Sequence, residues 1–360
     1  MNEQGRNVNL FFKQLGQSIL YWTLAMVFFA IFRYYGLSEE EGITTIPQFN
    51  FPRALSMFLL FGLFIGMVSA IIEFFLDRYL SKRISIGLSL VVTFVIYFIS
   101  IIILSTLIIE LSNKVYDLGM DNRRGWWIYD KTFWAIIVYM IFAALIFSSI
   151  QIANEKFGKG VFLKMLFGKY REPKEEKRIF LFLDLKSSTA IAEELGHLKY
   201  SQLIQDCFYD LNEIVTDFDA EIYQYVGDEA VLCWPYQKGL ANNNCVRLFF
   251  AFQRRLHEKK EYYFNKYGTS PEFKAGLHGG ILMVAEVGVV KKEVAYHGDV
   301  INTSARIQAE CNKHKVPILI SEELLNDLKI DVSFKSRHLG DVLLKGKLKK
   351  VNIHTLMSNV

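Results

Sequence analysis

Two aspartates occupy positions from which their carboxylates could share a metal ion. Asp184 follows an apolar run at residues 179–183, and Asp228 lies in a Gly-Asp-Glu turn between two further apolar segments. Mg²⁺ in proteins commonly binds one or two carboxylates together with substrate phosphates. Together the two aspartates indicate a divalent-cation site for a phosphorylated substrate, although either one alone is more often a helix cap or a turn former.

The surrounding pattern predicts an α+β domain with a ferredoxin-like plan. In this plan the first strand is a neighbour of the hairpin, so Asp184 and Asp228 are expected to converge. The expected elements are a buried strand at 179–183, a helix at 190–218 broken at Gly196, a hairpin of 221–226 with 230–234, a helix at 241–267, a strand at 273–285 with a turn at Gly279 and Gly280, a helix at 299–312 and a strand at 316–320.

Two more groups suit phosphate chemistry. Asn302 and Arg306 lie four residues apart in a predicted helix and so share one face, where the planar guanidinium can bind phosphate oxygens. Backbone N–H groups of residues 185–189, at the turn into the first helix, are placed to hold phosphates. The competing interpretation of the Asn and Arg is an ordinary polar helix face.

The first 152 residues have the composition of a membrane domain. The chain is 52% hydrophobic, and its charged residues are sparse before residue 152 and dense after it. Four apolar stretches, at 17–32, 54–76, 84–109 and 133–152, approach or exceed the roughly 20 residues that cross a bilayer as a helix. We therefore expect an all-α membrane domain of four transmembrane helices, with buried core helices as the alternative interpretation.

The placement of charges favours a cytoplasmic position for the second half, and so a multi-pass protein of the inner membrane. An even number of spans puts the residues before the first span and after the fourth on one side. Basic residues mark cytoplasmic loops; here they follow span two (Arg78, Lys82, Arg83) and span four (Lys156, Lys159, Lys164, Lys169), although loop 110–131 is also basic. Glu73 and Glu110, near the ends of spans two and three, are expected to reach water at the interface.

Three parts follow from these patterns. Residues 1–153 form the four-helix transmembrane domain, 154–177 a juxtamembrane linker or transducer, and 178–360 a catalytic domain. The linker is basic and broken by Pro173, so it is expected to lie on anionic lipid headgroups, to pass a change in the membrane helices onward, or both. The net charge of +4, with no basic run beside aromatics, argues against a nucleic-acid partner. The four cysteines lack metal-site spacing and are interpreted as buried or incidental thiols in a reducing compartment: Cys207, Cys233, Cys245 and Cys311.

Three motifs carry a family resemblance. FLDLKSSTAIAE (182–193), YVGDEAVLCW (225–234) and GDVINTSARIQ (298–308) resemble the first metal motif, the second metal hairpin and the signature helix of class III adenylate and guanylate cyclases. The resemblance covers about residues 178–357 and is specific, because the motifs occur in the family's order and at suitable spacing. It implies a nucleotidyl cyclase, which converts a nucleoside triphosphate into a 3′,5′-cyclic nucleotide.

The resemblance also implies roles for individual residues. Asp184 and Asp228, with Leu185 beside them, are implied to hold two Mg²⁺ or Mn²⁺ ions per site, while Asn302 orients the ribose and Arg306 stabilises the developing phosphate charge. In this family the aspartates come from one subunit and the Asn and Arg from the other, which implies a head-to-tail homodimer with two sites. The implied substrate-binding residues are Ser187, Ser188, Thr189, Gln224, Ala295 and Lys345, with Lys347 a near-equivalent of Lys345.

Some positions depart from the family pattern. Gln224 and Ala295 stand where adenylate cyclases usually carry the Lys and the Asp or Thr that bind adenine, with Tyr296 and His297 as nearby substitutes. The usual Gly and Phe of the first motif are replaced by Ser187 and Ser188. ATP is favoured, giving cyclic AMP and pyrophosphate, and GTP and pyrimidine triphosphates stay open.

Two rival functions belong to other classes. A diguanylate cyclase shares the fold and a Gly-Gly-Asp-Glu-Phe hairpin, but residues 226–230 lack the second glycine, and Asn302 and Arg306 are present. A non-catalytic nucleotide-binding signalling module would be expected to have lost a metal aspartate or Arg306, and neither loss has occurred.

Overall fold

The computed structural model of the chain divides it into two compact units, Met1–Gln151 and Ile152–Val360, and each unit is described by itself. The residues that the structure describes are 3–35, 51–75, 86–117, 123–157, 165, 167–290, 292–330, 333–344 and 349–359.

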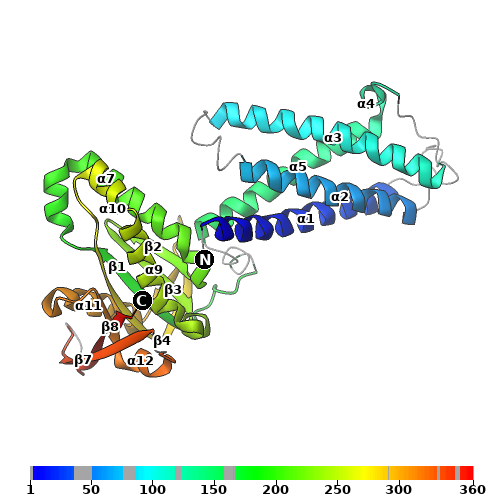
Figure 1. Ribbon diagram of the computed structural model, residues 1–360. Helices are drawn as coiled ribbons and strands as arrows, with labels where there is room; N and C mark the ends of the chain where they lie inside the picture. The colour runs from blue at the N-terminus through cyan, green and yellow to red at the C-terminus, as the bar shows by residue number, and fades with distance from the viewer. Residues whose placement is uncertain are drawn as a thin grey trace. The chain divides into compact units, whose positions relative to one another are not determined.

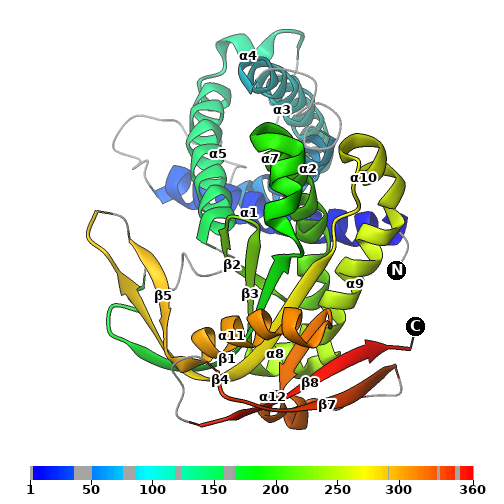
Figure 2. The same cartoon turned by 90° about the vertical axis from the view of Figure 1, so that its left-hand side faces the viewer.

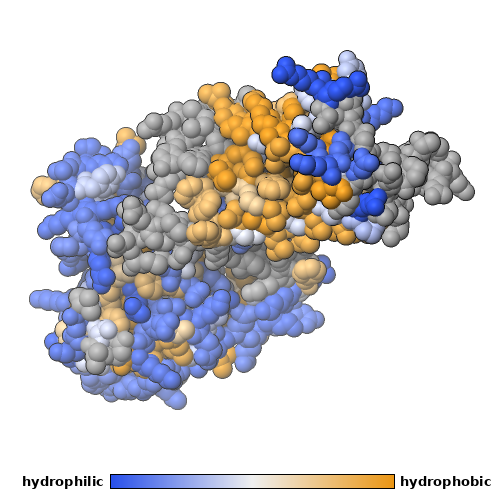
Figure 3. Space-filling model, turned by 45° about the vertical axis from the view of Figure 1, so that its right-hand side comes forward, coloured by the Kyte–Doolittle hydropathy of each residue, from blue (hydrophilic) through white to orange (hydrophobic). Residues whose placement is uncertain are grey.

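The first unit contains four helices that are long and apolar enough to cross a membrane (Figure 1). They are α1 (Glu3–Tyr35), α2 (Phe51–Phe75), α3 (Ile86–Tyr116) and α5 (Lys131–Phe157), with a short α4 (Trp126–Tyr129) before α5. Apolar side chains cover much of their visible surface, whereas the second unit is mostly hydrophilic outside (Figure 3). The expected four apolar helices are confirmed. The third apolar window, Phe94–Val115, runs later than predicted and therefore includes Glu110 rather than ending there.

Two glycines let α1 and α2 pack closely. A Cβ added at Gly62 would lie 2.7 Å from the Cα of Thr23, and one at Gly66 would lie 2.6 Å from the Cα of Ile19. Small residues four apart are a common way for apolar helices to bring their backbones together. The pair of helices thus forms an antiparallel hairpin held by backbone proximity.

Polar side chains from three helices meet inside the first unit. Glu73 accepts hydrogen bonds from Gln14 Nε2 at 3.4 Å and from Ser69 Oγ at 3.1 Å, and Tyr97 donates its hydroxyl to Ser69 at 2.8 Å. Polar groups in an apolar surrounding are stabilised by such bonds. Glu73, expected only to reach water at an interface, therefore also joins α1, α2 and α3.

The second unit is built on a mixed sheet with the strand order β2-β3-β1-β4-β6-β8-β7 and β5 added beside β4. The first four strands in this order are antiparallel and make the ferredoxin-like core, whereas β6 joins β4 in parallel. This confirms the expected α+β class. The strands are β1 (Lys174–Leu185), β2 (Glu221–Val226), β3 (Glu229–Pro235), β4 (Phe273–Val287), β5 (Glu293–His297), β6 (Ile318–Ser321), β7 (Phe334–Val342) and β8 (Val351–Ser358).

Helices cover the two faces of this sheet unequally. On one face α7 (Ser188–Val215), α9 (Asn244–Glu258) and α10 (Lys260–Tyr267) bury the main apolar core, and on the other face α11 (Asp299–His314) lies against β4 and β1 (Figure 2). The helix expected over 241–267 is divided at Lys259 into α9 and α10. The shorter elements are η3 (Thr216–Phe218), α8 (Tyr236–Leu240), η4 (Ala241–Asn243) and α12 (Glu322–Asp327).

The central strand β1 is apolar at consecutive positions because it is buried on both faces. Ile179, Leu181 and Leu183 point into the core beneath α7 and α9, while Phe180 and Phe182 enter a second apolar cluster on the α11 face. A strand buried on both faces needs apolar residues at consecutive positions. Because side chains alternate along a strand, Asp184 falls on the same face as Phe180 and Phe182.

The turn predicted at Gly279 and Gly280 is wrong, because β4 runs unbroken from Phe273 to Val287. Two of its glycines instead make room for α11: a Cβ at Gly276 would lie 2.2 Å from the backbone nitrogen of Gln308, and one at Gly280 would lie 2.9 Å from Val300 Cγ2. Glycine inside a strand often marks such a close approach. These residues therefore set the distance between α11 and the sheet.

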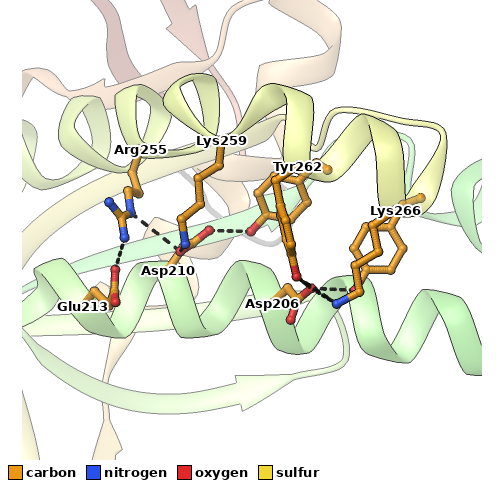
Figure 4. A network of polar contacts seen from close by, with 9 residues as sticks. Asp206, Asp210, Glu213, Arg255, Lys259, Tyr262 and Lys266 are labelled. Atoms are coloured by element: carbon orange, nitrogen blue, oxygen red, sulfur yellow. Dashed lines mark hydrogen bonds and ion pairs between the residues drawn. The ribbon is translucent and has the colours of Figure 1, made fainter. Parts of the chain in front are cut away.

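An ionic network fastens α7 to α9 and α10 (Figure 4). Asp210, which is 1% exposed, accepts a hydrogen bond from Tyr263 at 2.6 Å and pairs with Lys259 and Arg255. One turn earlier in α7, Asp206 pairs with Lys266 at 2.8 Å. A buried carboxylate with several donors is satisfied where an unpaired one would destabilise the fold. The network holds the part of α7 that follows Gly196, where the backbone departs from helical geometry with φ 70°, as the sequence predicted.

Candidate active site

Strand pairing surrounds Asp184 with charged neighbours. Its partners across the sheet are Glu229 of β3 and Lys274 of β4. Lys274 Nζ lies 3.0 Å from Asp184 Oδ2, and Gln308 of α11 donates a hydrogen bond from Nε2 to the same oxygen, also at 3.0 Å. Among the described residues, both contacts fall on Oδ2. The other carboxylate oxygen, Oδ1, is thereby left for a further partner.

Asp228 approaches from the hairpin tip between β2 and β3. It follows Gly227, whose φ of 62° lies in the left-handed region that glycine adopts readily. Its Oδ2 is buried and has no hydrogen-bond partner among the described residues. Burial raises the pKa of Asp184, Lys274 opposes that rise, and the charge of Asp228 adds to it. The two carboxylates are therefore brought together, as expected from the sequence.

Glu229 is a third carboxylate that the sequence reasoning did not include. Burial, and then the charges of Asp184 and Asp228, raise its pKa from 4.5 to about 7, and Lys274 partly opposes the rise. Tyr200 of α7 lies in the same field, since burial and the charge of Asp228 raise its pKa. The Gly-Asp-Glu turn was the available signal for Glu229, but only the register of β1 with β3 shows that it faces Asp184.

This arrangement fits a divalent cation. The negative charges of several carboxylates act on one another at a partly buried place, and one buried oxygen of Asp228 lacks a hydrogen-bond donor within the described part of the chain. Oxygen ligands of this kind suit Mg²⁺ and Mn²⁺. Asp184 and Asp228 are the residues that would hold the cation. Leu185 has a buried side chain at the end of β1, so only its backbone carbonyl could serve as a ligand.

The turn from β1 into α7 suits phosphate binding. Ser187 takes the left-handed conformation, with φ 58°, at the position where the family pattern usually has Gly. The N–H of Ile191 makes the bond to Ser187 O, so the N–H groups of Ser188, Thr189 and Ala190 precede it at the helix start. Lys186 donates its N–H to the carbonyl of Glu272 at 2.8 Å, which removes it from the expected cradle.

The helix α11 presents Asn302 and Arg306 on its open side. Asn302 is exposed and Arg306 half-buried, whereas Thr303, Ile307 and Gln308 are buried against the sheet. In the part of the chain that the structure describes, no hydrogen bond or ion pair joins Asn302 or Arg306 to the aspartates. Their roles stay predictions.

The positions expected to contact the base lie on two strands. Gln224 is exposed on β2 after a register shift at Ile222, and Ala295 pairs with Ala285 between β5 and β4. The ring of Tyr296 packs against Tyr223, 4.8 Å between centroids, and over the guanidinium of Arg178 at 5.0 Å. Tyr296 is therefore committed to packing, while His297 is exposed. Lys345 and Lys347 lie outside the described residues.

Comparison with known proteins assigns the second unit of the chain to a family. Residues 170–358 match the family described as adenylate and guanylate cyclase catalytic domain. Adenylate cyclase 2 of Rhizobium meliloti (strain 1021) is 36% identical over 203 residues, which are 56% of each chain. Adenylate cyclase 1 of the same organism is 25% identical over 189 residues, which are 50% of this chain and 27% of that one. The chain thus spans about half the length, or less, of these curated relatives.

A solved bacterial light-regulated adenylyl cyclase has the same fold in its matched part. The TM-score is 0.52 at 16% identity, and the match covers 63% of this chain and 66% of that one. At this identity the similarity concerns the fold alone.

The raised pKa of Glu229 predicts a pH-dependent effect on stability. Its carboxyl holds a proton up to about pH 7 in the folded chain but only to about 4.5 when unfolded, so ionisation disfavours folding. This penalty is absent below the unfolded pKa and grows as pH rises through the folded pKa. Glu229→Gln should therefore be more stable than wild type at pH 8, by on the order of 1 kcal/mol, and similar at pH 5.

Thermal unfolding of the detergent-solubilised chain in EDTA at both pH values measures this difference. A Glu229→Gln variant with the same stability offset at pH 5 and pH 8 would contradict the prediction. Excess Mg²⁺ should narrow the gap at pH 8, since a cation favours the ionised carboxylates of the wild type.

Proposed function

The chain belongs to the family of adenylate and guanylate cyclase catalytic domains, and from this premise we propose that it is a membrane-bound adenylate cyclase converting ATP to 3′,5′-cyclic AMP and pyrophosphate. The observation that carries the proposal is the proximity of Asp184 to Asp228, whose buried Oδ2 has no hydrogen-bond donor among the residues that the structure describes. A triphosphate with its cations would supply the positive charge that this group of carboxylates needs.

The chemistry needs little from the protein beyond positioning and charge. The 3′-oxygen of the ribose forms a bond to the α-phosphorus, the bond from that phosphorus to the pyrophosphate oxygen breaks, and the hydroxyl proton is released. Two cations, when bound, would activate the hydroxyl and neutralise the phosphates. Asp184 and Asp228 would hold them, Arg306 would bind the phosphate charge that develops, and Asn302 would orient the ribose.

A second copy of the chain would complete the site. Asn302 and Arg306 lie on the open side of α11, while Gln308 on its buried side contacts Asp184 of the same protomer. This supports a head-to-tail homodimer in which each site combines the aspartates of one protomer with the Asn and Arg of its partner. Membrane anchoring would favour the dimer by raising the local concentration of protomers.

ATP is the proposed substrate because the two relatives described above, at 36% and 25% identity, are named adenylate cyclases, whereas relatives at 22% and 23% identity are named guanylate cyclases. Gln224 can donate and accept hydrogen bonds and is exposed, so it could contact a purine edge. Ala295 offers no side-chain hydrogen bond. GTP is the first alternative, since the family also includes guanylate cyclases.

The proposed division has residues 1–153 as the membrane domain, 154–177 as a linker and 178–360 as the catalytic domain. The linker is proposed to pass conformational changes from the membrane helices to the catalytic domain. Its described end is fastened to the sheet: Tyr170 is 2% exposed, donates its hydroxyl to Glu176 at 3.0 Å and accepts the N–H of Glu286 at 2.8 Å. Glu176 in turn pairs with Arg178 at 3.0 Å, and Arg178 pairs with Glu221 of β2 at 2.7 Å. The strand β1 itself begins at Lys174, earlier than predicted.

Nucleotide turnover tests the proposed activity and its side of the membrane. Sealed inner-membrane vesicles with their cytoplasmic face outward should convert added ATP to 3′,5′-cyclic AMP with Mg²⁺ or Mn²⁺, as resolved by mass spectrometry. Asp228→Ala should lower the rate by at least about 100-fold, because it removes a cation ligand. ATP, GTP, CTP and UTP are compared in parallel.

Preferred turnover of GTP would make the chain a guanylate cyclase. Product from none of the four triphosphates, in vesicles or in detergent, would favour a nucleotide-binding signalling module instead. Product formed only after the vesicles are opened would contradict the cytoplasmic location.

Mixed dimers test the shared site. Asp184→Ala and Arg306→Ala should each abolish activity in homodimers, whereas co-expression of the two variants should restore one intact site per dimer. The expected recovery is roughly half the wild-type rate in doubly tagged dimers, because one of two sites is whole. No recovery in purified mixed dimers would contradict the head-to-tail arrangement.

The linker proposal is tested at Tyr170. Tyr170→Ala removes a buried ring and should lower turnover about tenfold, whereas Tyr170→Phe keeps the ring, loses only the bond to Glu176 and should lower turnover less than threefold. The comparison is made on full-length protein in vesicles. Unchanged turnover in Tyr170→Ala would show that this contact does not matter for the catalytic domain.

A further inference from the structure

Gln308 links the helix that carries Asn302 and Arg306 to a metal aspartate of the same protomer. It lies two residues after Arg306 but on the buried side of α11, where it is 6% exposed. Its Nε2 donates to Asp184 Oδ2 at 3.0 Å. The helix can lie this close to the sheet because residue 276 is glycine, where a Cβ would come within 2.2 Å of the Gln308 nitrogen.

We propose that Gln308 is a positioning residue for metal binding: it fixes the orientation of the Asp184 carboxylate and leaves Oδ1 for the cation. The inference rests on the proposed function. It also means that α11 serves two sites of the dimer at once, with its open side contributing Asn302 and Arg306 to the partner's site and its buried side ordering Asp184 in its own.

An amide is suited to this task. Lys274 already places a positive charge on Asp184 Oδ2, so a second cation there would compete with a metal for the same carboxylate. The amide of Gln308 donates a hydrogen bond without adding charge. A carboxylate that is held by two donors on one oxygen loses rotational freedom, and partners that orient metal ligands in this way typically change metal affinity by about 10- to 100-fold when they are mutated.

The contact could instead serve packing alone, and a substitution of similar size separates the two roles. Gln308→Met keeps the volume of the side chain but cannot donate a hydrogen bond. Positioning predicts that Gln308→Met weakens cation binding. Packing alone predicts that Gln308→Met, which fills the same space, binds the cation as the wild type does.

The first test is direct binding of Mn²⁺ to the full-length chain in detergent. Binding is measured as the loss of the electron paramagnetic resonance signal of the free ion. Gln308→Met should weaken Mn²⁺ binding about tenfold, and Asp184→Ala should abolish it. Thermal unfolding in EDTA checks that the Met variant is folded. Binding within twofold of wild type in a folded Gln308→Met variant would overturn the proposal.

Mixed dimers then show whether Gln308→Met acts by releasing the Asp184 carboxylate or by moving α11 and with it Arg306. One protomer carries Asp184→Ala and supplies Arg306, and the other carries Arg306→Ala and supplies Asp184. Gln308→Met in the protomer that supplies Asp184 should raise the Mn²⁺ concentration for half-maximal turnover about tenfold. The same change in the other protomer should raise it less than twofold.

Equal effects in both placements would mean that the substitution moves α11 and disturbs Arg306, which would overturn the positioning role. A parent mixed dimer without activity would be a failure of the proposed function, not of the Gln308 inference, because the Mn²⁺ binding series stands without turnover. The two failures are therefore distinguishable.

Discussion

The repulsion among carboxylates at the end of β1 is the constraint to which the rest of the catalytic unit responds. Asp184, Asp228 and Glu229 lie close enough for their charges to act on one another, and burial together with the charges of Asp184 and Asp228 raises the pKa of Glu229 to about 7. Lys274 compensates in part through its 3.0 Å contact with Asp184. The remaining negative potential, with an oxygen of Asp228 that has no donor among the described residues, suits a cation and the phosphates that it would carry.

Helices on both faces of the sheet contribute to the region around Asp184. On one face the ionic network around Asp210 holds the part of α7 after Gly196, and the first turn of α7 follows Asp184 closely in the chain. On the other face Gly276 and Gly280 admit α11 so closely that Gln308 reaches Asp184. In the proposed dimer, the same helix would connect metal binding inside one protomer with the residues that it offers to the other, so a shift of α11 would affect two sites.

The two units of the chain place their apolar side chains in opposite ways. The first exposes apolar side chains along helices long enough to cross a membrane, and within it Glu73 accepts hydrogen bonds from Gln14 and Ser69. The second buries its apolar residues beneath helices on a sheet. Tyr170 lies in the segment of chain between the membrane helices and β1. Its ring is buried against the sheet of the second unit, and its hydroxyl donates a hydrogen bond to Glu176.

The sequence by itself determined the apolar helices and the α+β class, because each depends on composition and periodicity along single elements, and it predicted Asp184 and Asp228 as a pair from the expected strand order and the family resemblance. It also identified Asn302 and Arg306 as neighbours on a helix face. It did not identify Lys274, Glu229 or Gln308 as partners of Asp184, since these come from β4, β3 and α11, and only strand register and helix packing bring them together. Gly279 and Gly280 show the same limit: glycine favours a turn by its backbone freedom, but it also admits close packing, and the choice between the two is made by the tertiary structure, where β4 continues and α11 lies against it.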